Sequence, residues 1–466
     1  MQSDEIRLFS GKPRKKARRA SERLEEIEDR KHGNKGDANM GARDVSLADD
    51  STRKADDAGL MDSFDALGVG EHLCAVLEGL GIVEPTAVQR GCIPAIMKGR
   101  NVIGIAQTGS GKTAAFALPV LQGLARNPYG VFTLVLTPTR ELAFQIADQC
   151  KAFGAGQNLR VCVVVGGLDS QEQAKQLERR PHVVIATPGR LKALIDGSST
   201  LAKAFQRTAF LILDEADRLL DESFEDDLGT ILECLPAKRQ TLLFSATMTR
   251  ALVTLQQELL EDAFVFEAYE GLQTASGLRE TVTVVPAKVK EVYLTYLLRN
   301  LEEYDVRSVM VFASTRKSCQ NLVQLLEQLE IPVTALHSGL PQRERMASLD
   351  RFKSGRINTL VSTDVGSRGL DIPEVDLVVN FDLPKLAEDY VHRVGRTARA
   401  GRSGWSLSFV SQYDIELLKA IESETKRRMD EFKFDESKVL KLLSGVYQAQ
   451  RVKNIELAKS SSRSRR

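Results

Sequence analysis

The chain has 466 residues, enough for about two to four ordinary domains. Hydrophobic residues make up 42% of it and charged residues 27%, fractions that are typical of a globular protein with real cores. Lys and Arg number 64 against 63 Asp and Glu, so total charge does not indicate a nucleic-acid partner, and any basic surface must be local.

The six cysteines are scattered and form no C-x-x-C pair or Cys/His ligand pattern: Cys74, Cys92, Cys150, Cys162, Cys234 and Cys319. This pattern indicates small buried side chains in a reducing compartment rather than disulfides or a zinc site. No apolar run reaches the ~18 residues of a membrane span, and the N-terminus lacks the apolar core of a signal peptide. The sequence therefore predicts a soluble intracellular protein without membrane association.

The first segment, residues 1–61, is polar, rich in charge of both signs and contains one aromatic residue, Phe9. Such a segment buries too little apolar surface to offset its ordering entropy, so we predict a disordered arm. Residues 12–19 carry six cations in eight positions. One interpretation is a solvated run of charges, and the other is a functional segment that serves as a nuclear-import signal or an RNA-binding arm. The basic tail at residues 459–466 leaves the same alternatives open.

The rest of the chain alternates short apolar, β-branched runs with helical patterns, which is typical of buried parallel strands in βα units. This pattern predicts an α/β fold with two tandem domains, each a parallel β-sheet flanked by helices, at residues 62–268 and 278–430. A polar, glycine-containing linker joins them at residues 269–277. A helical extension and basic tail follow at residues 431–466. The expected strands lie near residues 102–105, 132–136, 161–165, 183–185, 210–213, 242–244, 282–285, 309–312, 333–336, 359–361, 375–379 and 406–410.

A glycine-rich turn follows the first expected strand and opens a helix. It comprises Ala106, Gln107, Thr108, Gly109, Ser110, Gly111, Lys112 and Thr113. Its glycines let backbone N–H groups face phosphate oxygens, and the helix N-terminus adds positive potential. Lys112 would neutralise the β- and γ-phosphates of a nucleotide, and the Thr113 hydroxyl would bind Mg²⁺. The alternative, a turn that binds nothing, is disfavoured by the strand–loop–helix context.

An acidic group ends the apolar strand near residues 210–213, where Asp214, Glu215 and Asp217 follow in close order. A nucleotide-hydrolysing site needs one carboxylate near the metal and another that orients and deprotonates the attacking water. We assign the first role to Asp214, which would contact Mg²⁺ through a water, and the second role to Glu215. Alone, this pattern would indicate an ordinary helix start, since Asp caps helices well. Together with the phosphate loop, it predicts a catalytic site for nucleotide hydrolysis.

From residue 64 to about residue 430 the chain resembles the DEAD-box RNA helicases, motif after motif in family order. This resemblance implies two RecA-like domains. Phe64, Pro85, Thr86 and Gln89 resemble the adenine-recognition motif, in which Phe64 would stack on the base and Gln89 would read its edge. The resemblance implies RNA contacts for Pro138, Thr139, Arg140, Gly167, Thr187, Gly189, Arg190, Gln342, Arg345 and Thr363. It also implies ribose or nucleotide contacts for Gly369 and Asp371, arginine fingers at Arg396 and Arg399, and coupling roles for Ser245, Thr247 and His392.

Each implied role has a plainer alternative, because residues of these types are singly more often helix caps, core residues or solvated charges. For His392, the motif favours a bond between the domains, to the acidic group, over a simple core position. Ala106 stands where the usual loop has Gly, Gly366 and Ser367 replace the commoner Ala-Ala, and Ala398 replaces Gly. These exchanges are all between small residues. The resemblance gives no role to Trp405, the one tryptophan.

The resemblance implies an RNA-stimulated ATPase that clamps single-stranded RNA, using ATP and Mg²⁺, and locally unwinds short duplexes. Two alternatives remain open: an ATP-gated RNA clamp with little unwinding, and a DNA-acting relative. Stretches such as residues 91–96, 127–130 and 411–415 resemble a nucleolar branch that acts in small-subunit ribosomal RNA processing. We therefore expect a nuclear, nucleolar protein with a monomeric core, pre-ribosomal RNA as its partner and a protein cofactor of unknown identity.

Overall fold

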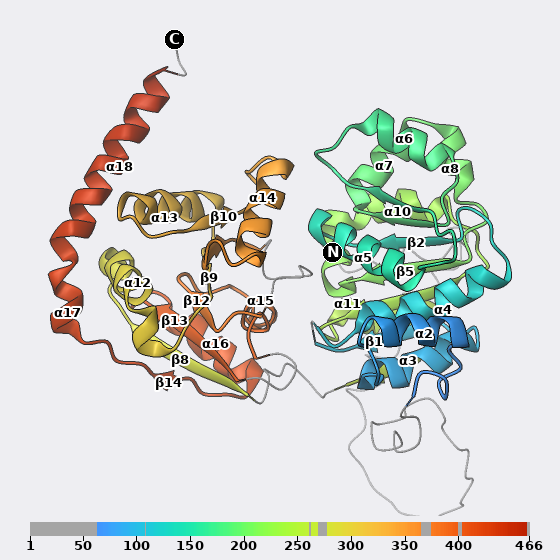
Figure 1. Cartoon of the computed structure of the whole chain (residues 1–466), viewed down its shortest axis with the longest axis horizontal. Coiled ribbons are helices and arrows are strands. Elements are labelled where there is room, and N and C mark those ends of the chain that lie inside the picture. Colours follow the sequence, from blue (N-terminus) through green and yellow to red (C-terminus); the bar gives the residue numbers. More distant parts are fainter. Residues whose placement is uncertain are drawn as a thin grey trace, which may run out of the picture.

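A computed structural model of the chain describes residues 63–107, 109–260, 262–268, 277–364, 374–398 and 403–463. Two α/β domains lie side by side, with the C-terminal helix α18 running along the outer side of the second domain and projecting beyond it (Figure 1). The expected fold class, two tandem RecA-like domains with parallel sheets flanked by helices, is confirmed. The expected disordered arm and nearly all of the expected linker lie outside the described residues.

Each domain contains one seven-stranded sheet in which every recorded strand pair is parallel. The strand order is β3-β4-β2-β5-β6-β1-β7 in the first domain and β10-β11-β9-β12-β13-β8-β14 in the second. Adding seven to every strand number of the first order gives the second, so the two domains share one topology. In a parallel sheet all strands end at the same edge, and ligands bind in the crevices beyond that edge.

The strands of the first sheet are β1 Val102–Ile105, β2 Thr133–Leu136, β3 Val161–Val164, β4 Val183–Ala186, β5 Phe210–Asp214, β6 Gln240–Ser245 and β7 Phe264–Glu267. Its helices are α2 Glu71–Gly79, α3 Ala87–Met97, α4 Lys112–Arg126, α5 Arg140–Phe153, α6 Ser170–Glu178, α7 Pro188–Asp196, α8 Ser199–Ala204, α9 Ala216–Leu219, α10 Glu225–Glu233 and α11 Arg250–Leu259, with a 3-10 turn η3 at Glu222–Phe224.

The second sheet comprises β8 Leu278–Val284, β9 Val309–Phe312, β10 Thr334–Leu336, β11 Thr359–Ser362, β12 Leu377–Asn380, β13 Gly404–Val410 and β14 Asp430–Glu431. Its helices are α12 Lys290–Arg299, α13 Arg316–Gln328, α14 Gln342–Lys353, α15 Ala387–Val394, α16 Ile415–Thr425, α17 Glu436–Lys441 and α18 Leu443–Arg463, with 3-10 turns η4 Ala287–Val289 and η5 Leu301–Tyr304.

Alternation of side chains along the strands explains why these runs are apolar throughout. Leu211 and Leu213 of β5 belong to one core cluster of the first domain, whereas Ile212 between them belongs to the other. A strand with helices on both faces of its sheet must be hydrophobic at every position. Each domain therefore has a core on both sides of its sheet, and the polar residues that matter for function are concentrated at the strand ends.

The C-terminal segment after residue 430 packs onto the second domain through aromatic residues. Phe432 contacts Tyr304 and Trp405, with ring centroids 5.9 and 5.2 Å apart, and Phe434 packs against Phe409 at 6.3 Å. Trp405 donates from Nε1 to the Thr281 hydroxyl at 2.8 Å. Trp405 thus has a structural explanation as part of the surface that receives this segment.

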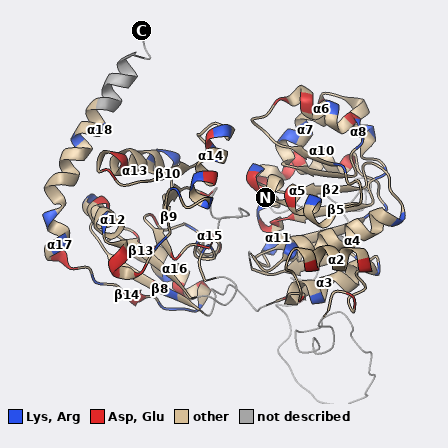
Figure 2. Ribbon diagram, viewed as in Figure 1, with Lys and Arg blue, Asp and Glu red and all other residues tan. Residues whose placement is uncertain are grey.

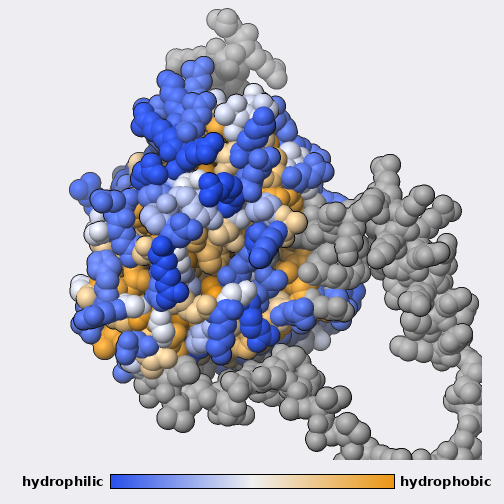
Figure 3. All heavy atoms as spheres, turned by 90° about the vertical axis from the view of Figure 1, so that its right-hand side faces the viewer, coloured by the Kyte–Doolittle hydropathy of each residue, from blue (hydrophilic) through white to orange (hydrophobic). Residues whose placement is uncertain are grey.

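Acidic and basic residues are mixed over both domains (Figure 2). On the face of the first domain that is turned away from the second, hydrophilic residues are interspersed with hydrophobic ones (Figure 3). Of the helices in the described part of the chain, none combines the length and apolar character that crossing a membrane requires. All six cysteines have free thiols.

Candidate functional site

The glycine-rich turn after β1 has the backbone geometry of a phosphate cradle. Gly109 and Gly111 have φ values of +86° and +90°, a region that side chains with a Cβ rarely adopt. A Cβ on Gly111 would lie 2.4 Å from Gln89 Nε2, so only glycine fits there. The Ser110 Oγ atom is buried and has no hydrogen-bond partner among the described residues. These features fit a loop that binds a phosphate group.

The adenine-motif residues hold this loop in place. Gln89 is buried, donates from Nε2 to the Gly111 carbonyl at 3.0 Å and accepts from the Thr86 backbone N–H at 2.9 Å. The second bond is part of the capping box that starts α3. Pro85 accepts a bond from Arg90 at 2.6 Å through its carbonyl, and Phe64 is buried in the core of the first domain.

Lys112 opens α4 and points back into the loop, where its Nζ donates to the carbonyls of Ala106 at 2.6 Å and Ser245 at 3.2 Å. Burial lowers the pKa of Lys112, whereas the carboxylates of Asp214, Asp217 and Glu215 oppose that shift. Arg396 of the second domain lowers the pKa further, so its charge acts on this lysine from across the domain boundary. Thr113 is half-buried beside it.

The acidic group lies at the carboxyl end of β5. Burial raises the pKa of Asp214 to about 6, while nearby Lys112 and the Glu215 N–H lower it. The Glu215 N–H donates to Asp214 Oδ1 at 3.2 Å. Glu215 itself has a φ of +56°, in the left-handed region, which costs a non-glycine residue on the order of 1 kcal/mol. Strain of this kind concentrates at functional sites, because the surrounding structure must hold it.

Asp217 connects the coupling residues of both domains. Its Oδ2 atom accepts a hydrogen bond from the Thr247 hydroxyl at 3.1 Å and lies 3.4 Å from His392 Nε2. Thr247 is in turn held by Ser245, whose hydroxyl donates to the Thr247 carbonyl at 2.9 Å. Asp217 and His392 have side-chain exposures of 2% and 1%. The structure therefore brings the acidic group and His392 together in a buried contact between the domains.

The expected arginine-finger motif lies in and after α15. Arg396 is fully buried and donates from Nε to the His392 carbonyl at 3.4 Å. Arg393, which was not among the predicted site residues, is also fully buried, and it donates to Asp364 Oδ1 at 2.6 Å and to the Asp382 carbonyl at 2.7 Å. Four other expected site residues, Thr108, Gly369, Asp371 and Arg399, lie outside the described part of the chain.

Several expected RNA-contacting residues share one edge of the first sheet, because each follows a parallel strand. Thr139 follows β2 and caps α5, accepting from the Leu142 N–H at 3.4 Å, and Thr187 follows β4 and caps α7. Gly167 follows β3 with a φ of +83°, and a Cβ there would lie 2.5 Å from Arg140 Nη1. The remaining members at this edge are Pro138, Gly189 and Arg190. The Arg190 guanidinium donates to the carbonyls of Val165 and Leu168.

The expected RNA contacts of the second domain lie opposite this edge. Gln342 Nε2 donates to Glu141 Oε1 at 2.9 Å, and Arg345 Nη2 lies 2.7 Å from Glu141 Oε2. Glu141 and Arg345 have side-chain exposures of 2% and 6%. We call these three residues the closure triad. Thr363 is buried after β11.

Glu141 was not among the predicted site residues, although it directly follows the expected RNA contacts Thr139 and Arg140. An acidic residue in the first turn of a helix is ordinarily explained by the helix dipole. Its partners are 201 and 204 positions away, so no local pattern could have revealed the contact. Only the polar character of Gln342 and Arg345 on α14 was available as a signal.

Comparison with known proteins decides the family. A family model described as DEAD/DEAH box helicase matches residues 86–255, and one described as helicase conserved C-terminal domain matches residues 289–401. DEAD-box ATP-dependent RNA helicase 36 of Arabidopsis thaliana is 50% identical over 370 residues, covering 79% of this chain and 75% of that protein. The chain belongs to the DEAD-box ATP-dependent RNA helicases.

This DEAD-box helicase is also 47% identical over 401 residues to the probable ATP-dependent RNA helicase DDX49 of Homo sapiens, covering 85% of this chain and 83% of that protein. A solved structure of S. cerevisiae Dbp5 bound to RNA and ADP BeF3 is 28% identical, with a TM-score of 0.74, and the match covers 84% of this chain and all of that one. The expected family and enzyme class, an ATP-hydrolysing RNA helicase, are confirmed.

Proposed function

We propose that this helicase binds ATP in the first domain and closes its two domains on single-stranded RNA, and that closure completes one catalytic site. The observation that supports this proposal most directly is the buried contact between Asp217 and His392, together with the effect of the Arg396 charge on Lys112. Residues more than 170 positions apart act on one another there, so the site belongs to neither domain alone.

The phosphate loop supplies the ATP contacts. The N–H groups between Gly109 and Gly111 and the Lys112 ammonium bind the phosphates, while Phe64 and Gln89 select adenine. Glu215 orients the attacking water and takes its proton on the carboxylate. Arg396, with Arg399 as the expected second finger, stabilises charge on the transferred phosphoryl group after closure.

Thr113 and Asp214 fit a magnesium site, since a hydroxyl and a carboxylate are the hard oxygen ligands that this ion prefers. Bound Mg²⁺ would neutralise phosphate charge. Asp214 would contact it through water. The described residues contain no cluster of three His, Cys, Asp or Glu side chains suited to a metal.

The RNA track runs along the strand ends that carry Thr139, Gly167, Thr187 and Thr363. Hydroxyls, backbone N–H groups and Arg190 suit contacts to phosphates, which position a strand without reading its sequence. Contacts to the 2′-hydroxyl would give the preference for RNA over DNA. Equal ATPase stimulation by RNA and by DNA of the same sequence would contradict that preference.

The composite site is tested by Arg396→Ala and Arg396→Lys, with Arg343→Ala on exposed α14 as the matched control. Both Arg396 variants should keep ATP affinity, which the first domain supplies, and lose on the order of a thousandfold in RNA-stimulated turnover. Lysine should rescue poorly, because a point charge cannot hold two oxygens. The melting of the second domain is measured in parallel. Unchanged turnover in a folded variant would exclude the composite site.

The closure triad also favours a second candidate, an ATP-gated RNA clamp that unwinds little. A buried ion pair between the domains would slow reopening and so prolong RNA binding. The ratio of duplex unwinding to ATP hydrolysis, measured on a short RNA duplex, separates the two functions. Many ATP hydrolysed per duplex, together with slow RNA release, would favour the clamp.

We further place the protein in small-subunit ribosomal RNA processing in the nucleolus, on the resemblance of residues 91–96, 127–130 and 411–415 to that branch. The cations at residues 12–19 suit nuclear import, and a protein cofactor and a monomeric core are expected. Crosslinking in cells followed by sequencing of the bound RNA tests the target. Recovery of messenger RNA without pre-ribosomal RNA would refute the assignment.

A further inference from the structure

The first domain carries a row of arginines at the edge of its sheet opposite the ATP and RNA sites. The connections that lead into the neighbouring strands β3, β4, β2 and β5 are residues 154–160, 179–182, 127–132 and 205–209. They contain four arginines and no aspartate, glutamate or lysine, and a fifth arginine ends α4 just before one of them. We call these five residues the basic edge: Arg126, Arg160, Arg179, Arg180 and Arg207.

Helix α4 shows where the basic edge lies. It begins at Lys112, whose pKa the charge of Arg396 lowers from across the domain boundary, and it ends at Arg126 on the side turned away from the second domain (Figure 1). Its 15 residues give it a length of about 22 Å. Parallel strands all begin at the same edge of their sheet, so the connections into them lie together. The basic edge is therefore separate from the RNA track, which follows the ends of the strands.

Contacts between the connections place three of the arginines next to one another. The backbone N–H of Arg160 donates to His182 Nδ1 at 3.2 Å, and Arg160 Nη2 lies 3.1 Å from His182 Nε2. The Arg180 carbonyl packs against the glycine that follows Tyr129, so closely that a side chain at that glycine would clash with it. Tyr129 donates from its hydroxyl to the Arg207 carbonyl at 3.0 Å. Arg160, Arg180 and Arg207 thus follow one another along the edge.

The backbone of Arg180 is strained. Its φ is +50°, in the left-handed region, although it directly precedes Pro181, a position that favours extended backbone. Strain of this kind is concentrated at functional sites, because the surrounding structure must hold it. Packing against the glycine after Tyr129 holds Arg180 in this conformation, between Arg160 and Arg207 in the row.

The positive charge of the basic edge is uncompensated. All five arginines are exposed, and none of them forms an ion pair within the part of the chain that the structure describes. The chain as a whole has 64 basic and 63 acidic residues, so this row is a local excess. Burial and the charge of Arg160 lower the pKa of His182, so its ring is neutral near pH 7 and the positive charge comes from the arginines. Such a surface attracts a polyanion.

The rings between the arginines favour RNA over an acidic protein segment. The Arg207 guanidinium lies over the Tyr129 ring, 5.1 Å from its centroid, and His182 is half-buried beside Arg160. Unpaired bases stack on aromatic rings and on guanidinium planes, and guanidinium groups bind phosphates through two parallel hydrogen bonds. With neighbouring strands about 4.8 Å apart, the four connections span about 14 Å. This length corresponds to about four nucleotides at ~3.4 Å each.

We infer that the basic edge is a second RNA-binding surface, which holds a flanking single-stranded segment of the RNA that occupies the cleft. The inference rests on the proposed function, because it takes RNA as the substrate. Arg160, Arg180 and Arg207 bind phosphates, and bases stack on Tyr129 and on the Arg207 guanidinium. This surface belongs to one domain and does not require ATP or closure. RNA held there stays attached when the cleft opens after hydrolysis.

The length of RNA between the two surfaces can be modest. About 30 nucleotides span on the order of 100 Å at ~3.4 Å each. Helix α4, which runs from the cleft to the basic edge, is about 22 Å long. An extension of this length therefore reaches from the track around the first domain.

The test compares two single-stranded RNAs on the full chain without nucleotide. One has about 10 nucleotides and fills the cleft only, and the other carries an extension of about 30 nucleotides. The natural chain should bind the longer RNA at least about tenfold more tightly. Arg160→Gln with Arg207→Gln should remove most of this advantage, because each lost charge-assisted bond accounts for about a factor of ten. The slope of log K against log salt should become shallower by about 1.4, at ~0.7 per phosphate.

Controls separate the basic edge from general charge and from folding. Lys438→Gln with Lys441→Gln removes two exposed cations from α17 on the second domain and should change neither the affinity nor the salt slope. All variants keep the basic N-terminal arm, so a difference between them comes from the replaced residues. Melting curves show whether each variant is folded. If the first pair unfolds, Arg126→Gln with Arg179→Gln repeats the test at two exposed positions.

Tyr129 decides between RNA and an acidic protein segment. Tyr129→Phe keeps the ring, and Tyr129→Leu should bind the longer RNA at least about fivefold more weakly than Tyr129→Phe, the loss expected for one stacked base. Polyglutamate of matched charge should displace the longer RNA poorly. Equal binding by the two Tyr129 variants, together with efficient displacement by polyglutamate, would indicate an acidic protein partner and overturn the inference.

The same measurements distinguish failure of this inference from failure of the proposed function. ATPase stimulation by the short RNA, measured on the natural chain, depends on the cleft, and its absence would count against the proposed function. Equal affinity of the natural chain and the Arg160→Gln, Arg207→Gln variant for the longer RNA would instead exclude the basic edge as an RNA-binding surface.

Discussion

The closure triad offers the clearest test of how the two domains communicate. Glu141→Gln leaves the shape of the side chain nearly unchanged but removes the charge that Arg345 contacts at 2.7 Å. In the closed form, Arg345 would remain buried without its anionic partner. Removing one partner of a buried ion pair costs about 3–5 kcal/mol. In the open form both side chains would be hydrated, so this cost falls on closure alone.

At about 1.4 kcal/mol per factor of ten, the closure equilibrium should fall roughly one hundred- to three thousandfold. Fluorescence energy transfer between dyes on the two domains, measured with RNA and a non-hydrolysable ATP analogue, reports this equilibrium directly. ATP affinity without RNA should stay unchanged, because Lys112 and its loop lie wholly in the first domain. The RNA concentration needed for half-maximal ATPase should rise.

Two controls separate closure from folding. Glu344→Gln removes a charge from an exposed position next to Arg345 and should have no effect on closure. The exchanged pair Glu141→Arg with Arg345→Glu should restore part of the loss, which a merely destabilised helix α5 would not do. If Glu141→Gln closes as readily as the natural chain, the triad contributes nothing to closure and the reasoning fails.

Four further predictions concern single side chains. Lys112→Ala should abolish ATP binding or hydrolysis, and more than about half of the natural ATPase rate would remove Lys112 from the site. Glu215→Gln should bind ATP and RNA but release RNA slowly, and fast release would contradict its role as base. Burial alone would raise the pKa of Asp414, but hydrogen bonds from Ser411 and the charge of Lys290 hold it below its ordinary value. Asp414 therefore stabilises the fold above its unfolded pKa of about 3.9, and that stability is lost as the pH falls through the lower folded value. Asp414→Asn should thus lower the melting temperature at pH 7, and the difference from the natural chain should shrink as the pH is lowered below about 3.9. Phe434→Ala should destabilise the second domain by about 3 kcal/mol, because it removes the ring that Phe432 packs against at 4.9 Å, and a melting curve followed by the fluorescence of Trp405, which contacts Phe432, would show this.

Much of the fold follows from the sequence, because buried parallel strands are apolar at every position and so are visible as runs. The expected strands all lie within or beside observed ones, whereas β7 and β14 were missed. Both are short edge strands, and β14 consists of Asp430 and Glu431, which carry no apolar signal. β14 pairs with β8, and the neighbouring Phe432 contacts Tyr304 and Trp405. Because these contacts join residues far apart in the sequence, no local pattern indicates the strand.

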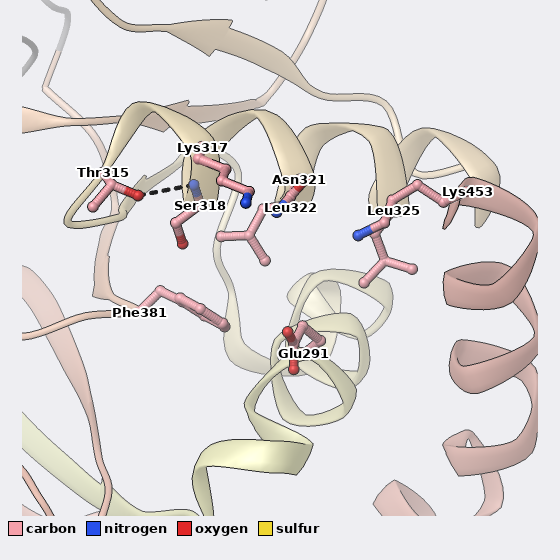
Figure 4. Close-up of a pocket in the computed structure, with 9 residues that line it drawn as sticks. All are labelled: Glu291, Thr315, Lys317, Ser318, Asn321, Leu322, Leu325, Phe381 and Lys453. Carbon is pink, nitrogen blue, oxygen red and sulfur yellow. Dashed lines mark hydrogen bonds between the residues drawn. The ribbon is translucent and has the colours of Figure 1, made fainter. Parts of the chain in front are cut away.

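The site was less completely predictable than the fold, because several of its contacts join residues that lie far apart in the sequence. Motifs show which residues carry chemistry, and they predict the contact of His392 with the acidic group, but the partners of Glu141 come from the other domain without any sequence signal. The sequence also does not show that Gln89 supports the phosphate loop through Gly111, since that bond depends on how α3 packs beside α4. The cavity that Lys453 lines in the second domain (Figure 4) depends on where α18 lies, and a helical pattern alone does not specify the surface that receives this helix.

Because the two domains share one topology, the loop after β1 can be compared with the corresponding loop after β8 in the second domain. Lys112 begins the helix after β1, and Lys290 begins the helix after β8, the corresponding strand of the second sheet. The connection after β8 contains Val285, Pro286 and Ala287 but no glycine, so its backbone lacks the left-handed positions that turn N–H groups toward a phosphate. Lys290 instead donates to the Phe381 carbonyl at 3.1 Å and pairs with Asp414 at 3.3 Å. A lysine at this position is thus not sufficient for a nucleotide site. In the mechanism that we propose, the second domain contributes Arg396, which follows α15, to a site that the first domain builds.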